Sequence, residues 1–366
     1  MKNKVGTGRP VLSKKDKSMK KTMVRALALL LTVCLSLGIV SCNGASGKTE
    51  GSKGQINVEI PSESGDEESF EGSCPIPEDE EQLRAFVSAS KNYESSYLSG
   101  RDTKEVACYV ADDRAILIRK VSFGFGPDKV TAYVADIYLS DIRDLIGCVL
   151  FDEEGAISKG TPEDVMNTVE DALFIVNTDF MRSRSWGLYV RGGKVYRSKP
   201  TAGIDICAIG KDGKMEILDG DTLDPEQLME EGNVWHVLTF GPSLLNEDGT
   251  PRDHNSEFRI NDNYSRHDED ETVSSVGFLA PNPRTAIGQA EDGHYILVSV
   301  DGRDKWYSRG MRFPELSHLM YEEGASVAYN LDGGGSVFMY YDGKPVNSNT
   351  GGRSPSDYFV ILKKEN

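Results

Sequence analysis

The chain has 366 residues, 38% of them apolar, which is enough to bury a large core. Its 58 acidic residues outnumber its 41 Lys and Arg and give a formal net charge of −17. Nine of the basic residues but only one acidic residue precede Ser41, so without that segment 32 basic face 57 acidic residues, a net charge of −25. A field of this sign repels nucleic acid, and no nucleic-acid partner is expected.

The N-terminal segment has the layout of an export signal. Residues 14–25 are basic, and residues 26–40 form an uncharged apolar run that is too short for a comfortable membrane span. The run ends in Ile39-Val40-Ser41-Cys42, which resembles the bacterial lipobox, whose cysteine is lipidated and becomes the mature N-terminus. We therefore expect a signal peptide over 1–42 and an exported protein held at the cell membrane by a lipid on Cys42. The alternative is a simple cleaved signal or an uncleaved anchor.

Three further regions follow in the predicted organisation. Residues 43–81 are rich in Gly, Ser, Lys and Glu and are predicted to form a disordered acidic linker. Residues 82–105 are predicted to form a helical lead-in, because Leu83, Phe86 and Val87 have helical spacing before Gly100. Residues 106–363 are predicted to form a single domain. Beyond the linker lie four scattered cysteines, either thiols or disulfides of unknown pairing: Cys74, Cys108, Cys148 and Cys207.

The domain reads as a β-rich α+β fold, with mixed, mostly antiparallel sheet and a few short helices. Strands are predicted at 106–110, 115–121, 129–139 and 173–176, and hairpins at 187–197 and 205–218. Thr161 and Asp224 each precede a proline and are predicted to cap short helices. His236 lies in a strand-like run and is interpreted as a core or surface histidine rather than a catalytic one.

Polar side chains follow two of the predicted strands. Asn177 and Asp179 follow the apolar run 173–176, and binding residues tend to lie at such strand exits. Arg284 opens a strand whose antiparallel partner ends in Asp301 and Arg303, so these three residues are expected at one edge of the sheet. A surface ion pair is the alternative explanation. The acidic residues within 261–272 have irregular spacing, which favours a solvated loop over a calcium loop.

The glycine-rich motif Asn330-Leu331-Asp332-Gly333-Gly334-Gly335-Ser336 lies between two apolar runs and predicts strand, glycine turn, strand. Glycines permit positive φ and close backbone approach, so several N–H groups are able to converge on an anion. The alternative is a glycine-rich turn with no further role.

Several separate segments agree, in chain order, with one family. The chain resembles the phosphodiester glycosidases at residues 176–180, 240–245, 283–288, 300–303, 308–314, 329–336 and 351–353. Two positions depart from the family pattern. Thr178 stands where the family often has Gly after the first Asn, and Val337 stands where a second Ser or Thr often follows Ser336.

The resemblance implies hydrolysis of a glycosyl-1-phosphodiester on cell-surface or extracellular glycans such as exopolysaccharide, with the sugar released from a phosphomonoester. A phosphomonoester leaves readily, so the reaction needs a carboxylate to activate water or attack carbon and cations to hold phosphate. The catalytic candidates are Asp332, Asp301 and Asp179. The substrate-binding candidates, including guanidinium groups suited to phosphate, are Asn177, Arg284, Thr285, Arg303, Asn330, Gly333, Gly334, Gly335, Ser336 and Arg353.

Other classes fit the residues less well. The chain has no Gly-x-Ser-x-Gly elbow, and the glycine run lacks the Lys of a P-loop. The rival hypothesis from a different class is a lipid-anchored protein that binds glycan or phosphoglycan without turnover. No cofactor or metal ligand is predicted, and the sequence leaves open whether a divalent cation such as calcium assists. The expected partners are a phosphate-linked carbohydrate and, through the lipid, a membrane.

Overall fold

The computed structural model describes residues 56–61, 74–93, 98–199, 201–260, 279–348 and 352–364. The chain divides into two compact units, Met1–Lys53 and Gly54–Asn366, and every described residue belongs to the second. Cys42, with the predicted signal peptide, and the acidic segment 261–272 lie outside the described residues. In the described part of the chain, no helix has the length and apolar character needed to cross a membrane.

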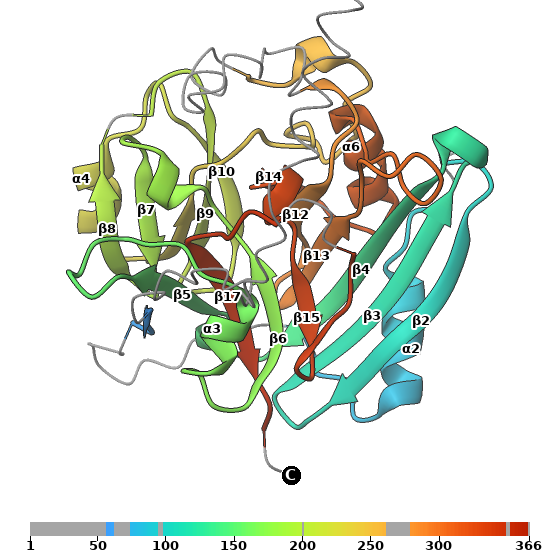
Figure 1. Cartoon of the computed structure of the whole chain (residues 1–366), viewed down its shortest axis with the longest axis horizontal. Helices are drawn as coiled ribbons and strands as arrows, with labels where there is room; N and C mark the ends of the chain where they lie inside the picture. Colours follow the sequence, from blue (N-terminus) through green and yellow to red (C-terminus); the bar gives the residue numbers. More distant parts are fainter. Residues whose placement is uncertain are drawn as a thin grey trace, which may run out of the picture. The chain divides into compact units, whose positions relative to one another are not determined.

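Three sheets make up the second unit, and each strand pairing in its described residues is antiparallel (Figure 1). The first sheet has the order β1 (Asn57–Glu59), β5 (Ile146–Phe151), β17 (Asp357–Leu362), β6 (Ala172–Asn177), β15 (Met339–Tyr341) and β16 (Lys344–Pro345). The second has the order β14 (Val327–Leu331), β12 (Arg284–Glu291), β13 (His294–Val300), β4 (Val130–Leu139), β3 (Arg114–Phe123) and β2 (Asp102–Val110). The third has the order β10 (Met215–Asp219), β9 (Asp205–Gly210), β11 (Val234–Leu238), β7 (Leu188–Arg191) and β8 (Lys194–Ser198). The helices are α2 (Glu80–Ala89), α3 (Pro162–Met166), α4 (Pro225–Glu230) and α6 (Phe313–Glu322). The predicted mostly antiparallel α+β fold is confirmed.

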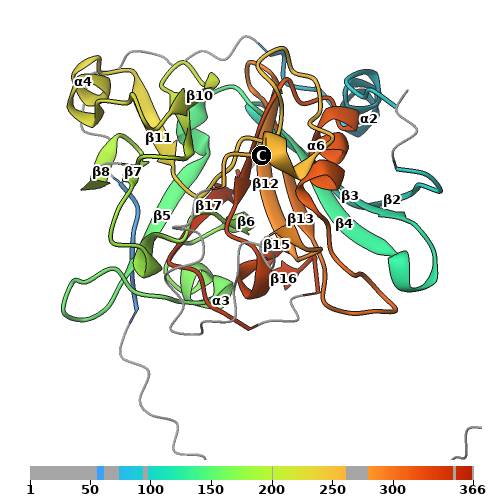
Figure 2. The same cartoon turned by 90° about the horizontal axis from the view of Figure 1, so that it is seen from above.

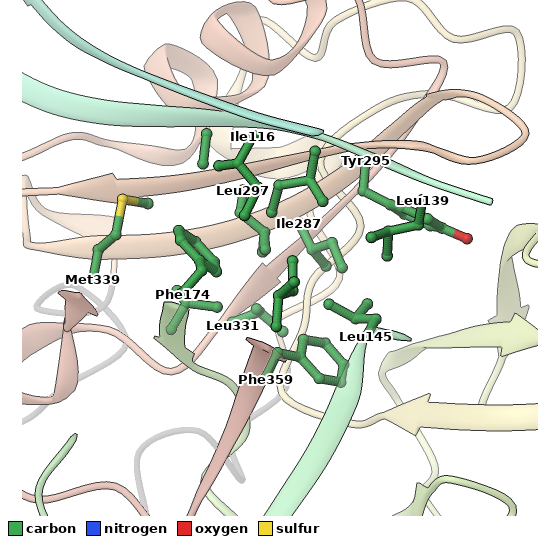
Figure 3. Packing of buried hydrophobic residues seen from close by; sticks show 14 of the residues in the cluster. Ile116, Leu139, Leu145, Phe174, Ile287, Tyr295, Leu297, Leu331, Met339 and Phe359 are labelled. Atoms are coloured by element: carbon green, nitrogen blue, oxygen red, sulfur yellow. The ribbon is translucent and has the colours of Figure 1, made fainter. Parts of the chain in front are cut away.

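The largest core cluster joins the first and second sheets and also includes residues of the third, such as Ile209 and Leu238 (Figure 3). Phe174 and Phe359 of the first sheet face Ile287 and Leu331 of the second. Since side chains alternate along a strand, the next residues of the second sheet point to its other face. There Ala286 packs with apolar residues of α6, and Figure 2 shows α6 and α2 beside this sheet. Strands β13 and β4 of the second sheet are therefore buried on both faces, and a site there is expected at their ends.

The order of the predicted elements agrees with the structure. Thr161 caps α3 through a capping box with Asp164, and the carboxylate of Asp224 caps α4. His236 is buried, and its Nε2–H donates to the carbonyl of Leu145 at 2.8 Å. Burial lowers the pKa of His236 to about 3, so the ring is a neutral core group, as predicted. The four cysteines of the described residues are all thiols.

Two predicted boundaries are corrected. The linker prediction over 43–81 fails at β1, whose residues pair with β5 in the register Asn57↔Phe151. Edge strands offer unpaired backbone groups to any extended segment, so composition gave no sign of this pairing. The helical lead-in 82–105 is also too long, because α2 begins at Glu80 and β2 already begins at Asp102. The first five residues of β2 are exposed, and such a polar strand lacks the apolar alternation that would have revealed it.

Candidate functional site

The glycine motif carries the chain from the second sheet to the first. β14 ends at Leu331 and β15 begins at Met339, so the predicted strand, turn and strand exist, but the two strands belong to different sheets. Two of the glycines are required by geometry. A Cβ on Gly333 would lie 2.7 Å from the carbonyl oxygen of Pro283, and Gly334 has a φ of +61°. The motif is therefore a crossing between sheets rather than a hairpin.

Two amides of the predicted anion-binding loop already have acceptors within the protein. The amide of Gly334 donates to the carbonyl of Pro283 at 2.9 Å, and the amide of Ser336 donates to the carbonyl of Gly333 at 3.2 Å. Residues Gly334–Ser336 form a 3-10 turn, and the amides of Gly334 and Ser336 are used within the protein. These two amides therefore do not point freely at a ligand, and side chains are the donors to consider beside them.

Asp332 lies at the end of β14 and is tied to the end of β6. Its amide donates to the carbonyl of Thr178 at 2.9 Å, and its own carbonyl accepts from Asn177 Nδ2 at 2.7 Å. The side chain is only 2% exposed, and its Oδ1 accepts from a terminal guanidinium nitrogen of Arg353 at 2.7 Å. Its Oδ2 has no hydrogen-bond partner among the described residues. Burial raises the pKa of Asp332, and the charge of Arg353 opposes that rise.

Arg353 stands between this buried carboxylate and solvent. Its side chain is 34% exposed, and its Nε donates to Ser336 Oγ at 2.8 Å. Its guanidinium lies 4.6 Å from the centre of the Phe180 ring. The Ser336 hydroxyl also lowers the pKa of Asp332. Its geometry does not make a hydrogen bond to Oδ2, so this oxygen is called open, meaning that it has no hydrogen-bond partner among the described residues. A buried acceptor without a donor is costly and is unusual outside functional sites.

Aromatic and cationic side chains surround this carboxylate. The guanidinium of Arg184 lies 4.6 Å from the Trp186 ring and 4.7 Å from the Phe240 ring, and its charge lowers the pKa of Asp332. Phe180 and Phe240 meet edge to face with ring centres 6.4 Å apart. The site-residue prediction missed Arg184, Phe180 and Phe240. Their only sequence signal was their position just after strands β6 and β11.

Asp179, the second predicted carboxylate, is sealed. It accepts from Arg191 at 2.8 Å and from the amide of Thr239 at 3.1 Å. The same nitrogen of Arg191 also donates to Asp357 at 2.6 Å, and Thr178 donates its hydroxyl hydrogen to Asp357. The side chains of Asp179, Asp357 and Arg191 are all fully buried, and burial raises the pKa of Asp179. This cluster therefore stabilises the backbone of the segment next to Asp332.

Asp301, the third predicted carboxylate, lies at the same sheet edge as Asp332. β13 and β14 both run antiparallel to β12, so their last residues are about 10 Å apart, two strand spacings. The predicted shared edge of Arg284, Asp301 and Arg303 therefore exists. The carboxylate of Asp301 accepts from Asn347 Nδ2 at 3.1 Å and from the Tyr307 hydroxyl at 3.0 Å. It also accepts from the amide of Ser348.

Two of the predicted arginines, Arg284 and Arg303, lie near each other at this edge, and burial together with the charge of Arg303 lowers the pKa of Arg284 to about 9. Arg303 has a φ of +63°, and its guanidinium lies 3.0 Å from the position that a Cβ on Gly334 would take. Arg284 is buried on the α6 side, where it donates to the carbonyls of Met311 and Ala280 at 3.1 and 3.0 Å. Its guanidinium lies 4.2 Å from the Phe313 ring. Backbone carbonyls and the Phe313 ring therefore hold this guanidinium in the structure, and its expected phosphate contact stays a prediction.

The remaining predicted binding residues hold the site together. Thr285 donates to Asn177 Oδ1 at 2.9 Å, which joins the second sheet to the first. Asn330 Nδ2 donates to the carbonyl of Gly241 at 2.7 Å and so holds the segment that carries Phe240. Gly335 accepts the backbone N–H of Arg353 at 3.0 Å. In the described part of the chain, no group of three His, Cys, Asp or Glu side chains is placed to hold a metal ion.

The family model for phosphodiester glycosidases matches residues 170–362. The chain belongs to this family. Every predicted catalytic and substrate-binding residue lies inside the matched range.

The chain is 28% identical over 182 residues to an uncharacterised SPbeta prophage-derived protein of Bacillus subtilis, YomE, covering 48% of this chain and 25% of that protein. It is 24% identical over 198 residues to N-acetylglucosamine-1-phosphodiester alpha-N-acetylglucosaminidase of Mus musculus, covering 54% of this chain and 32% of that protein. The matches thus span a quarter to a third of these relatives.

Solved structures show the same fold. The zebrafish N-acetylglucosamine-1-phosphodiester alpha-N-acetylglucosaminidase catalytic domain, auto-inhibited by its pro-peptide, is similar with a TM-score of 0.53 and 16% identity, covering 81% of this chain and 97% of that one. A hypothetical protein from Synechocystis gives a TM-score of 0.50 and 12% identity, covering 72% of this chain and 64% of that one. At these identities the likeness concerns the fold alone.

Proposed function

We propose that this chain hydrolyses a glycosyl-1-phosphodiester and releases the sugar from a phosphomonoester on cell-surface or extracellular glycans. The observation that carries the proposal is the open Oδ2 of Asp332, held in a buried site by Arg353 and bordered by aromatic rings. Membership of the phosphodiester glycosidase family supports the reaction class. The mouse relative is named for N-acetylglucosamine-1-phosphodiester, which supplies the first sugar to test.

The bond that breaks joins the anomeric carbon to the phosphate oxygen. Asp332 Oδ2 either takes a proton from the attacking water or attacks the anomeric carbon itself before water displaces it. The phosphomonoester leaves with the bridging oxygen and its electron pair, while the hydroxyl of water joins the sugar. Because this leaving group is already stable as an anion, one open carboxylate and a phosphate clamp are sufficient.

The phosphate clamp is assigned to Arg353 and Arg303. Arg353 contacts Asp332 and Gly333, and Arg303 lies beside Gly334, so the two guanidinium groups border the same short turn. A planar guanidinium pairs well with phosphate oxygens. Local cations of this kind are needed because the chain as a whole carries a net charge of −17.

The location belongs to the same proposal. The lipobox-like sequence ending in Cys42 supports export and a lipid anchor at the cell membrane. The substrate would then be a phosphate-linked carbohydrate outside the cytoplasm. Replacement of Cys42 by Ala is expected to move the protein from the membrane fraction to the soluble fraction or to block its processing. Unchanged membrane fractionation and mass would place the anchor elsewhere.

The decisive experiment incubates the purified chain with a panel of glycosyl-1-phosphodiesters, beginning with methyl N-acetylglucosamine-1-phosphate. Sugar and phosphomonoester are followed separately, with added calcium and with EDTA in parallel. Equal release of both products from at least one diester supports the proposal, and the two metal arms decide whether a divalent cation assists. Release of a sugar phosphate together with the free alcohol would mean cleavage of the other phosphate bond.

A second candidate function is binding without turnover. It is favoured by one observation, namely that Asp301 and Asp179 already accept several hydrogen bonds and leave only Asp332 open. Binding of a diester in equilibrium dialysis, with no product over long incubation, would support this candidate over the enzyme.

A further inference from the structure

Thr178 is the residue at which this chain departs from the family pattern beside a site residue, because the family often has Gly there. The residue is fully buried and follows Asn177, the last residue of β6. Among the described residues other than glycine, positive φ occurs only at Asp171, Arg303 and Asp342, so the backbone of Thr178 does not require a glycine. The position therefore accepts a side chain, and that side chain makes a contact that glycine lacks.

Two hydrogen bonds fasten Thr178 to the start of β17. Its hydroxyl donates to Oδ2 of Asp357, and its backbone N–H donates to the carbonyl of Asp357 at 3.3 Å. Asp357 is itself held, because Arg191 donates to its Oδ2 at 2.6 Å. A hydroxyl bound to a carboxylate forms one of the stronger hydrogen bonds in proteins, whereas the backbone N–H bond is at the long end of the normal range. The hydroxyl is therefore the stronger of the two attachments.

The backbone carbonyl of Thr178 holds the open carboxylate residue. It accepts the amide of Asp332 at 2.9 Å, while Asn177 Nδ2 donates to the carbonyl of Asp332 at 2.7 Å. Both backbone polar groups of Asp332 are thus bound by two consecutive residues at the exit of β6, which lies beside β17 in the first sheet (Figure 1). Asn177 is attached to the second sheet through Thr285, and Thr178 is attached to β17 through Asp357. A shift of Thr178 therefore moves Asp332.

We propose that Thr178 is a positioning residue for Asp332, and that its hydroxyl fixes the place of the open carboxylate by tying the exit of β6 to Asp357. The inference rests on the proposed function and adds a residue to it. The misplacement of a reacting group by about 1 Å costs up to about 10²-fold in rate. Glycine at this position would keep the carbonyl that accepts from Asp332 but would lose the hydroxyl that holds this carbonyl in place.

The competing explanation is that the Thr178 hydroxyl only stabilises the sealed cluster, and Ser356 supplies the matched control. Ser356 Oγ donates to the other oxygen of Asp357, Oδ1, at 3.0 Å, and Ser356 is 2% exposed. In the described part of the chain, no hydrogen bond joins Ser356 to Asp332. The two hydroxyls thus donate to the same buried carboxylate, and only that of Thr178 belongs to a residue bonded to Asp332.

The kinetic test uses the full-length protein and methyl N-acetylglucosamine-1-phosphate. Thr178→Val keeps the branched shape without the hydroxyl, and its kcat is expected to fall about tenfold while KM stays within about twofold. Thr178→Ser is expected to recover most of the loss, and Thr178→Gly to lose at least as much as Thr178→Val, which it replaces if that variant does not fold. Ser356→Ala is expected to keep kcat with a comparable loss of Tm. An equal fall of kcat in Thr178→Val and Ser356→Ala, or a raised KM at constant kcat, would overturn the inference.

Hydrogen exchange tests the same hold without turnover. The amides of Asp332 and Asp301 each follow the last residue of a strand and donate to backbone carbonyls, of Thr178 at 2.9 Å and of Thr131 at 3.0 Å. In protein with isotope-labelled aspartate, the exchange rate of the Asp332 amide relative to that of Asp301 is expected to rise about tenfold in Thr178→Val and to stay near the wild-type value in Ser356→Ala. An unchanged ratio in Thr178→Val would overturn the inference even in a wild type that cleaves the diester. A raised ratio with a wild type that cleaves no diester would remove the proposed reaction and keep Thr178 as the residue that holds Asp332.

Discussion

Two carboxylate and arginine clusters lie close together in this protein and differ in one respect. In the open cluster, Asp332 pairs with Arg353 at 2.7 Å, Arg353 is partly exposed, and one carboxylate oxygen has no partner among the described residues. In the sealed cluster, Asp179 and Asp357 share Arg191 at 2.8 and 2.6 Å, and all three side chains are fully buried. Both clusters lie beside the Asn177 to Asp179 segment at the exit of β6.

The difference distinguishes a group that supports a site from one that acts in it. A buried ion pair whose oxygens are all satisfied is costly to break and has no capacity left for a ligand. An unsatisfied buried oxygen costs stability in the resting protein, and a reaction that uses that oxygen gives a reason for the cost. We therefore propose that Asp332 takes part in bond cleavage and that Asp179 supports the backbone next to it.

The largest expected effect is on turnover in Asp332→Asn. This change keeps the size of the side chain but removes the negative charge, so kcat is expected to fall about 10²-fold or more while diester still binds. Burial raises the pKa of Asp332, so its charge costs stability at pH 7, and the variant is not expected to have a lower Tm. Steady-state kinetics and thermal melts test both statements. A larger kcat loss in folded Asp179→Asn than in Asp332→Asn would reverse the assignment.

The next effect is on stability in the sealed cluster. Arg191→Met leaves two buried carboxylates without their shared cation and is expected to lower the free energy of unfolding by about 3–5 kcal/mol. Urea unfolding followed by fluorescence measures this. Arg353→Met, in which a partly exposed guanidinium is removed, is the matched control and is expected to lose much less. Equal losses in the two variants would remove the distinction between the clusters.

A smaller effect concerns pH. The charge of Arg353 lowers the pKa of Asp332, so without it the carboxyl holds its proton to a higher pH. The acid limb of the kcat/KM profile is therefore expected to move to higher pH in Arg353→Met, with Arg353→Lys, which keeps the charge, in between. KM is also expected to rise, because the same guanidinium is assigned to phosphate. An acid limb that stays in place would mean that another group controls it.

The sequence predicted the elements of this fold well because the signals are local. The Thr161 cap and the hairpin turns each depend on residues a few positions apart. Asp179 and Asp332 look alike at that range, since each follows a buried strand with an Asn two residues earlier. The two aspartates differ in their partners. Asp179 contacts Arg191 in the next hairpin, and Asp332 contacts Arg353 beyond a further hairpin. No local pattern specifies those contacts.

Arg284 illustrates the same limit. Its predicted sheet edge was correct, but the face to which its side chain points was not fixed by that argument. Neighbouring residues on a strand point to opposite faces, so Thr285 reaches Asn177 while Arg284 reaches the segment beside α6. The contact of the Arg284 guanidinium with Phe313 depends on the packing of α6 on that face, which is tertiary information.

The smallest expected effect tests whether Asp301 belongs with the sealed or the open cluster. Burial raises the pKa of Asp301, and the amide of Ser348, Asn347 and the Tyr307 hydroxyl oppose that rise. Tyr307→Phe removes one of these donors and leaves the others, so kcat/KM is expected to fall only about fivefold, near 1 kcal/mol for one hydrogen bond. Tyr133→Phe is the control, because the Tyr133 hydroxyl of the wild type contacts Tyr307 at 3.1 Å without contacting Asp301.

A positioning role predicts a raised KM in Tyr307→Phe through displacement of the loop that carries Arg303. A fall of about 10² in kcat at constant KM would instead move Asp301 into the open cluster as a second reacting carboxylate.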